Sequence, residues 1–237
     1  MTQRSILAGK NQTIIIKTGL SVVVRGVDGG LVTATTEHKW GLKVERHNAA
    51  EFARARAAVG EYVLFDLRFK KPSPLRPSPV GRGDGGEGEV IEVQMGGSGE
   101  VFVPFESNLK IYAGKDIDVQ GIRGQVDAYA GFKVNMQNVY CLGNASAGWT
   151  MNLDCETMIG KEVTFGAGSD LRFHVADLTS ARLRVKDIGG YWEARIGDGE
   201  KSVYLKCGGD VTFVTDQKVE PLPPNYILGR IEKPSAA

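Results

Sequence analysis

The sequence has no apolar run long enough to cross a membrane and no large excess of charge of either sign. A membrane-spanning helix needs about 20 consecutive apolar residues, and the opening stretch MTQRSILAGKNQTIIIKTG lacks the continuous apolar core of a secretory signal. Lys and Arg number 29 and Asp and Glu 28, which gives a net charge of +1. A bulk field that would attract nucleic acid or an anionic membrane is therefore excluded. We expect a soluble, cytoplasmic protein without membrane insertion and without a nucleic-acid partner.

Cysteine and histidine are both scarce. The cysteines Cys141, Cys155 and Cys207 are odd in number, and no two of them form a C-x-x-C pair. Neither a disulfide framework nor a zinc site is indicated, so we interpret them as small buried residues in a reducing compartment. The chain has only three histidines, and none has the H-x-x-x-H spacing of a metal site. The sequence predicts no metal and no cofactor.

The motifs of common catalytic sites are absent as well. The chain has no G-x-x-x-x-G-K-[ST] phosphate loop, no G-x-S-x-G nucleophile elbow, and no G-x-G-x-x-G between a strand and a helix. At the second position after the anchors of the repeats described below, the acidic residues Asp116, Asp170 and Asp210 are not on adjacent units. This disfavours a carboxyl pair at the roughly 5–9.5 Å that glycosidases use. We predict that the protein is not an enzyme and has no catalytic residues.

Glycine, by contrast, is abundant. Its 31 residues amount to about 13% of the chain, against an ordinary share of about 7%. Proline is unremarkable at 9 residues. The excess of glycine indicates many tight turns between short strands.

Residues 1–69 have the pattern of a β-rich segment with one helix. Short β-branched runs alternate with turn residues, and Asp28-Gly29 between two such runs is a hairpin signal. The helix is expected over 49–59, because Asn48 can cap it, Glu51 completes a capping box and Gly60 follows its end. We predict that this segment caps one end of the domain.

Residues 70–89 have the composition of an extended arm. The stretch KKPSPLRPSPVGRGDGGEGE is rich in Pro, Gly and Ser and has no hydrophobic period. Its basic residues form a local patch and are candidate contacts for a partner: Lys70, Lys71, Arg76 and Arg82.

Six near-regular units follow between residue 109 and about residue 215. Each unit has an anchor glycine, and the anchors are Gly114, Gly131, Gly148, Gly168, Gly189 and Gly208. Their successive spacings are 17, 17, 20, 21 and 19 residues. We predict that each anchor is a structural corner at which the chain turns, and that glycine supplies the positive φ that a corner often requires.

Positions within these units alternate between apolar and mostly polar residues. The third position after the anchor is Ile117, Val134, Met151, Leu171, Trp192 and Val211. The fifth position is Val119, Met136, Leu153, Phe173, Ala194 and Phe213. This period of two predicts strands with one face in a core and the other in water.

These features predict an all-β fold. A unit of this length with two short strands and a glycine corner fits one coil of a β-solenoid, in which each coil pairs only with its neighbours. The alternative is an antiparallel β-sandwich of hairpins, which need not repeat one residue class at one offset. We predict an N-terminal cap over 1–69, the arm over 70–89, solenoid repeats over 90–216 and a C-terminal capping tail over 217–237.

The glycine-anchored units resemble a bacterial putative-adhesin family of short β-solenoids, whose coils read Gly-Asp-Val-x-Val. Gly114 to Val119 and Gly209-Asp210-Val211 match that pattern best. The chain is more distantly similar to the bactofilins, solenoid proteins that polymerise end to end. The likeness covers roughly residues 90–216 and implies a structural role without catalytic residues. The predicted helix and the Pro-rich arm belong to neither pattern.

Aromatic residues beside the anchors are candidate binding residues. Tyr112 and Tyr129 lie two residues before an anchor, and Trp149 directly follows one. Such a ladder can bind a sugar or a partner chain, or it can simply support the stack; the sequence leaves both readings open. We predict a structural or scaffold protein that assembles with itself, as a homo-oligomer or a subunit of an assembly, or with a protein partner. The alternative is a regulatory module that binds a ligand or partner on the exposed solenoid face.

Overall fold

The computed structural model describes residues 1–9, 12–37, 41–48, 89–158, 161–188, 190–222 and 230–234. Every regular element in these ranges is a β-strand, so the all-β prediction is confirmed. None of these residues belongs to a helix that could span a membrane. The predicted helix over 49–59 lies outside the described residues, as do Gly189 and the basic residues of the predicted arm, Lys70, Lys71, Arg76 and Arg82.

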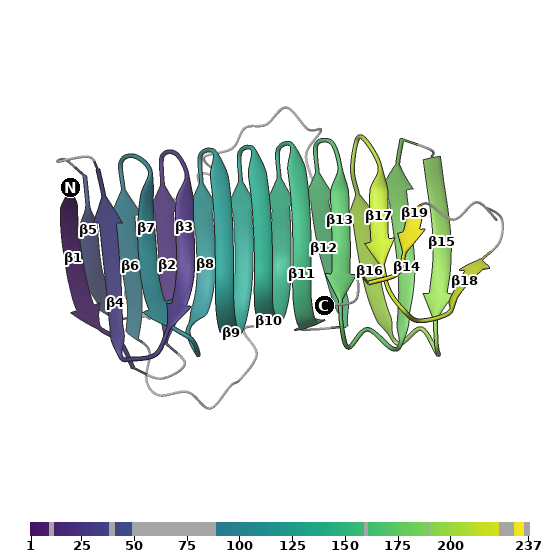
Figure 1. Cartoon of the computed structure of the whole chain (residues 1–237), viewed down its shortest axis with the longest axis horizontal. Coiled ribbons are helices and arrows are strands. Elements are labelled where there is room, and N and C mark those ends of the chain that lie inside the picture. Colours follow the sequence, from purple (N-terminus) through teal and green to yellow (C-terminus); the bar gives the residue numbers. More distant parts are fainter. Residues whose placement is uncertain are drawn as a thin grey trace.

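The strands lie side by side in one elongated body, with β1 near one end and β15 and β18 at the other (Figure 1). Their bounds are β1 Thr2–Leu7, β2 Thr13–Thr18, β3 Val22–Val27, β4 Leu31–Thr36, β5 Lys43–Asn48, β6 Glu89–Met95, β7 Gly99–Pro104, β8 Asn108–Ala113, β9 Asp116–Ala130, β10 Lys133–Ala147, β11 Thr150–Met158, β12 Glu162–Ala167, β13 Leu171–Val175, β14 Ala181–Asp187, β15 Gly190–Ile196, β16 Lys201–Lys206, β17 Val211–Val214, β18 Val219–Leu222 and β19 Arg230–Glu232.

Two ladders of parallel strands run the length of the body. The first ladder has the order β6, β2, β8, β9, β10, β12, β16 and β14. The second has the order β7, β3, β9, β10, β11, β13, β17 and β19. The long strands β9 and β10 belong to both, because their first halves pair in the second ladder and their second halves in the first. After each strand of the first ladder except β14, the chain turns and forms a strand of the second ladder, as from β12 to β13. We call such a pair of consecutive strands a layer.

The predicted apolar positions line the core between the two ladders. Ile117, Val134, Met151, Leu171 and Val211 are paired in register from one layer to the next, and each is at most 2% exposed. The fifth positions behave in the same way, and their aromatic members stack: the ring centroids of Phe173 and Phe213 are 5.7 Å apart. Burial of these side chains is the main favourable contribution to folding.

Glycine at the corner between the ladders is required by close backbone packing. A Cβ atom at Gly148 would lie 2.0 Å from the carbonyl oxygen of Gly131, and one at Gly168 would lie 1.9 Å from that of Gly148. None of the described anchors has a positive φ. The predicted positive φ is therefore not the reason for glycine at these positions: a Cβ at Gly114, Gly148, Gly168 or Gly208 would lie 1.9–2.3 Å from a backbone oxygen of the layer beside it.

The N-terminal strands do not form a separate cap. Strand β2 pairs with both β6 and β8, and β3 pairs with both β7 and β9. Residues 13–27 thus make a full layer between residues 89–104 and 108–120, and Gly19 occupies the corner against Gly114. The stacking order differs from the chain order at this end, which short-range sequence patterns do not reveal.

The unit anchored at Gly189 departs from the predicted register. Leu171 pairs directly with Val211, so Trp192 is not between them. Trp192 and Ala194 instead belong to β15, which forms an antiparallel hairpin with β14. Both are buried as expected. A hairpin strand and a parallel strand have the same period of two, so the alternation did not distinguish them.

Antiparallel strands close the N-terminal end of both ladders and the C-terminal end of the first, whereas the second ladder ends in β19, which pairs in parallel with β17. At the N-terminal end β5 pairs with β6, β4 with β7, and β1 with β4. At the other end β15 pairs with β14, and β18 with β15. The edge strand β18 contains Pro221, which has no N–H group to donate to a further strand.

The corner packing makes a direct prediction about two neighbouring glycines. Gly148→Ala should destabilise the protein by about 1–3 kcal/mol, because its Cβ would overlap a fixed backbone oxygen. Gly166→Ala is the matched control, since the nearest atom to its Cβ is 4.0 Å away, and it should change stability by less than about 0.5 kcal/mol. Urea unfolding followed by circular dichroism measures both. Equal stabilities would contradict the close packing of the corner.

Candidate functional site

Two rows of side chains flank the glycine corner and point away from the core. The tyrosine row lies two residues before the corner and runs, from one end to the other, through Gln94, Lys17, Tyr112, Tyr129, Ser146, Gly166, Lys206, Lys186 and Tyr191. The tryptophan row lies directly after the corner. Backbone hydrogen bonds of 2.7–3.1 Å join its members in the order Leu20, Lys115, Phe132, Trp149, Ser169, Gly209 and Ile188.

The predicted aromatic residues form two separate stacks on these rows. The rings of Tyr112 and Tyr129 lie 5.3 Å apart and within 12° of parallel, and both side chains are half-buried. Trp149 does not join them: it stacks on Phe132, with centroids 6.0 Å apart and the same small angle of 12°. Phe132 was missing from the predicted binding residues, although its place directly after the anchor Gly131 matches that of Trp149.

The Phe132/Trp149 stack is the more exposed of the two. Trp149 is 50% exposed and Phe132 39%. The ammonium of Lys133 lies 5.4 Å from the centre of the Phe132 ring, a cation–π contact. Aromatic rings exposed to this degree on a rigid surface are typical of binding sites, because their flat apolar faces gain free energy when a partner covers them.

An open, shallow hollow of about 410 Å³ lies next to this stack. Its polar lining comes from Lys133, Asn135, Thr150, Asn152, Asp170 and Arg172, on the outer face of β10, β11 and the chain up to β13. The Nδ2 atom of Asn152 donates a hydrogen bond of 2.9 Å to Oδ1 of Asn135 in the adjacent layer. The lining therefore offers both donors and acceptors in fixed positions.

Small residues follow the aromatic stacks on both rows. The tyrosine row continues with Ser146 and Gly166, and the tryptophan row with Ser169 and Gly209. A Cβ at Gly209 would lie 2.3 Å from Oδ1 of Asp170, so a side chain there would have to displace this carboxylate. Both rows are small together only in the layer of Gly166 and Ser169, because Ser146 shares its layer with Trp149 and Gly209 shares its layer with Lys206.

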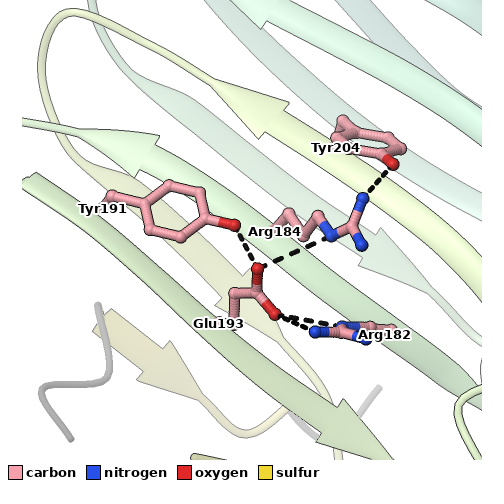
Figure 2. A network of polar contacts seen from close by, with 5 residues as sticks. All are labelled: Arg182, Arg184, Tyr191, Glu193 and Tyr204. Atoms are coloured by element: carbon pink, nitrogen blue, oxygen red, sulfur yellow. Dashed lines mark hydrogen bonds and ion pairs between the residues drawn. The ribbon is translucent and has the colours of Figure 1, made fainter. Parts of the chain in front are cut away.

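A network of polar contacts joins β14, β15 and β16 beyond this part of the rows, as Figure 2 shows. Arg182 donates from Nε and Nη2 to Oε2 of Glu193, at 3.0 and 2.6 Å. The Nε atom of Arg184 lies 3.6 Å from the other oxygen of Glu193, and its guanidinium contacts Tyr204. Tyr191 donates a hydrogen bond to Glu193 from its hydroxyl. The side chains cross three strands, so we interpret the network as a clamp that holds the terminal hairpin on the ladder.

The clamp shifts the pKa of its carboxyl group. The hydrogen bond from Tyr191 lowers the pKa of Glu193, and the hydrogen bond and charge of Arg182 and the charge of Arg184 lower it further, against a smaller opposing effect of burial. Desolvation raises the pKa of the Tyr191 hydroxyl, and its bond to Glu193 raises it further. Both shifts keep Glu193 charged and Tyr191 neutral at pH 7.

The other end of the first ladder has a buried carboxylate. Glu92 is 5% exposed, with the ammonium of Lys17 at 2.5 Å and the imidazole of His47 at 3.4 Å. Desolvation alone would raise the pKa of Glu92, but hydrogen bonds from Lys17 and Gln94 and the neighbouring charges lower it overall. These contacts tie β5 to β6 and β2, and we interpret them as structural.

The cysteines are placed much as expected. Cys155 and Cys207 are buried and Cys141 is half-buried, and all three are free thiols. Desolvation raises the pKa of Cys207 to about 11 and that of Cys155 further. Thiols with such pKa values are poor nucleophiles at neutral pH. In the described ranges, no three or more His, Cys, Asp or Glu side chains lie close enough to hold a metal ion.

Comparisons with known proteins add little to this geometry. No protein-family model matches the chain, and a search of curated proteins gives no match. A similar solved structure is that of a "putative cell adhesion protein" from Clostridium sporogenes, at 7% identity and a TM-score of 0.39, covering 98% of this chain and 99% of that one. The resemblance to adhesin-type solenoids and bactofilins therefore stays a prediction, and the proposals below rest on the residues alone.

The Glu193 clamp predicts a pH-dependent contribution to stability. A carboxyl group with a lowered pKa stabilises the fold above its unfolded value of 4.5 and loses this contribution as the pH falls through the folded-state value. Glu193→Gln should therefore lower the melting temperature by a few degrees at pH 7, and the difference from wild type should shrink as the pH falls below 4.5.

The matched control for this experiment is Glu220→Gln. Glu220 also pairs with an arginine, at 2.8 Å from Arg195, but its side chain is 45% exposed. Exposed pairs contribute little, so this variant should melt within about 1 °C of wild type. Equal effects of the two substitutions at pH 7 would contradict the role assigned to the clamp.

Proposed function

We propose that the chain is a non-enzymatic β-solenoid scaffold that binds an extended partner along its glycine corner. The observation that carries this proposal is the exposed Phe132/Trp149 stack beside an open hollow whose lining includes hydrogen-bonding side chains, both held on a regular backbone ladder. The solenoid reading is favoured over the sandwich because neighbouring layers pair in parallel and in one register. Hairpins of a sandwich would reverse direction at each step.

The largely covered ends favour binding on the side of the body over end-to-end assembly. A solenoid that polymerises through its ends needs an unpaired strand there that can extend the ladder. Here antiparallel strands cover the N-terminal end and the C-terminal end of the first ladder, where β5 carries Lys43, Glu45 and Arg46 and β18 contains Pro221. The second ladder ends in the parallel strand β19, which is only three residues long. The proposal therefore keeps the predicted scaffold role. It takes the position of the binding surface from the alternative prediction, a module that binds a partner on its exposed face.

A non-enzymatic role is consistent with how the described outward rows are used. Their polar side chains pair across layers, as in Asn135 with Asn152 and His174 with Asp154, whose Nδ1 and Oδ1 atoms are 2.8 Å apart. The imidazole and the carboxylate both lie on an open outer face, so water screens their interaction. Such pairs align neighbouring layers without forming an enclosed reaction site.

A panel of soluble polymers tests the proposed function. Neutral glycans, acidic glycans and polypeptides are titrated into the protein, and binding is measured by calorimetry. At least one polymer should bind saturably, and Phe132→Ala with Trp149→Ala should weaken it at least tenfold. Tyr140→Ala is the control, because Tyr140 is 54% exposed but lies in the middle of β10, away from the corner. Binding by none of the polymers, or binding that survives the double substitution, would contradict the proposal.

A further inference from the structure

Two lysines stand side by side on the tyrosine row. Lys186 of β14 and Lys206 of β16 are directly paired in the parallel register, so their backbones are one strand spacing, about 4.8 Å, apart. Both side chains are exposed. Like charges at directly opposed positions destabilise a sheet. Among the described residues neither ammonium has an acidic partner at ion-pair distance, so no direct ion pair offsets this repulsion in the free protein.

Carboxylates lie near the pair but do not reach it: Asp187, Asp170 and Asp210 are close enough to act on the Cys207 thiol, and none is at ion-pair distance from either ammonium. On one side of the pair lies Gly166, which has no side chain, and on the other lies Tyr191. The nearest carboxylate of the network, Glu193, is already shared between Arg182 and Arg184 (Figure 2). An anion from outside the chain would relieve the repulsion and accept hydrogen bonds from both ammonium groups.

The same strands carry a small excess of positive charge. Residues 181–206 contain six basic and four acidic residues, a net charge of +2, and Arg182, Arg184 and Arg195 are already ion-paired. Attraction of an anion to the end of the tyrosine row therefore comes from Lys186 and Lys206 themselves.

A low, open stretch connects the lysines with the stacked tyrosines. Between Tyr129 and Lys206 the row contains only Ser146 and Gly166. Three strand spacings separate Tyr129 from Lys206, or about 14 Å. The nearest atom to a Cβ built at Gly166 is 4.0 Å away, so no neighbouring side chain fills this stretch. One extended molecule can therefore contact the tyrosine rings and the lysines at once.

The chemistry of the row selects among extended polymers. A peptide that adds to a sheet needs a free strand edge, and a helix needs an apolar groove; on this face the backbone groups of the ladders are already paired. Single-stranded nucleic acid needs a basic groove along its whole backbone, whereas the basic pair here lies at one end. A polysaccharide presents flat C–H faces to aromatic rings, hydroxyl groups to a polar surface, and widely spaced acidic groups.

We propose that the glycine corner binds an acidic polysaccharide and that Lys186 and Lys206 bind one of its carboxylate or sulfate groups while Tyr129 and Tyr112 support a sugar ring. This inference rests on the proposed function and adds the class of ligand. The polymer runs along the row from the tyrosines to the lysines, over Ser146 and Gly166, parallel to the exposed Phe132/Trp149 stack.

Carboxymethyl dextran and unmodified dextran test the inference, because they share one chain and differ in charge. Calorimetry at low ionic strength should show saturable binding of carboxymethyl dextran and at least tenfold weaker binding of dextran. The double variant Lys186→Gln with Lys206→Gln should bind carboxymethyl dextran at least tenfold more weakly than wild type. Lys161→Gln with Lys218→Gln removes the same charge from exposed lysines off the row, and it should change the affinity less than twofold.

A third variant tests the path without changing the charge. Gly166→Leu places a side chain on the low stretch between the two ends, where the backbone has room for it. This variant should bind carboxymethyl dextran at least fivefold more weakly than wild type, while its melting temperature stays within a few degrees of wild type. Unchanged affinity would overturn the path over Ser146 and Gly166.

The outcomes separate this inference from the proposed function. Equal binding of both dextrans, lost in the Phe132/Trp149 double variant, would leave corner binding intact and overturn the acidic ligand. Tighter, lysine-dependent binding of poly-glutamate or of single-stranded DNA would overturn the polysaccharide class. If the Lys161/Lys218 double variant lost as much affinity as the Lys186/Lys206 double variant, only the overall charge would matter. That result would overturn the assigned anion site.

Discussion

The structure depends on the close stacking of backbone at one corner of every layer. From Gly19 to Gly168 each corner glycine donates its N–H to the residue before the corner in the adjacent layer, as Gly148 does to the carbonyl of Ala130 at 3.1 Å. The next residue continues the hydrogen bonding, from Trp149 to Phe132 at 2.8 Å and from Ser169 to Trp149 at 2.7 Å. Because no Cβ fits between the layers, the two ladders meet at a sharp edge with an unbroken backbone. Side chains on either side of that edge therefore lie in straight rows at a constant spacing.

The tyrosine and tryptophan rows explain why the glycine corner is suited to binding. Elsewhere on the described outer face, polar side chains pair with one another across neighbouring layers, as Asn152 does with Asn135. Stacked rings are fixed on both sides of the corner, and small residues in the following layers leave a path to the Lys186/Lys206 pair, on strands that the Glu193 clamp holds in place. A rigid site of this kind loses little conformational entropy when a ligand binds. Antiparallel strands cover most of the two ends, so the sides of the body are the larger exposed surface.

Sequence patterns predicted the all-β class, the corners and the inward residues of five of the six units, because each of these depends on a local period or a local glycine. The layer formed by residues 13–27 and the hairpin that contains Trp192 were not predictable in this way, because they depend on which distant strands pair, and parallel and hairpin strands alternate alike. Tyr112, Tyr129 and Trp149 were found from their offsets to the anchors. Lys186 and Lys206 were missed because they are adjacent only in the folded register, 20 residues apart in the chain.

The central claim is that a ligand binds at the corner, beside Trp149. The most direct measurement is the indole N–H signal of Trp149 in an NMR titration with carboxymethyl dextran, compared with that of Trp192, which is 4% exposed and donates to Asp187 in the terminal hairpin. The account predicts a saturable shift of the Trp149 signal and little change at Trp192. A saturable interaction that shifts Trp192 and leaves Trp149 unchanged would contradict it.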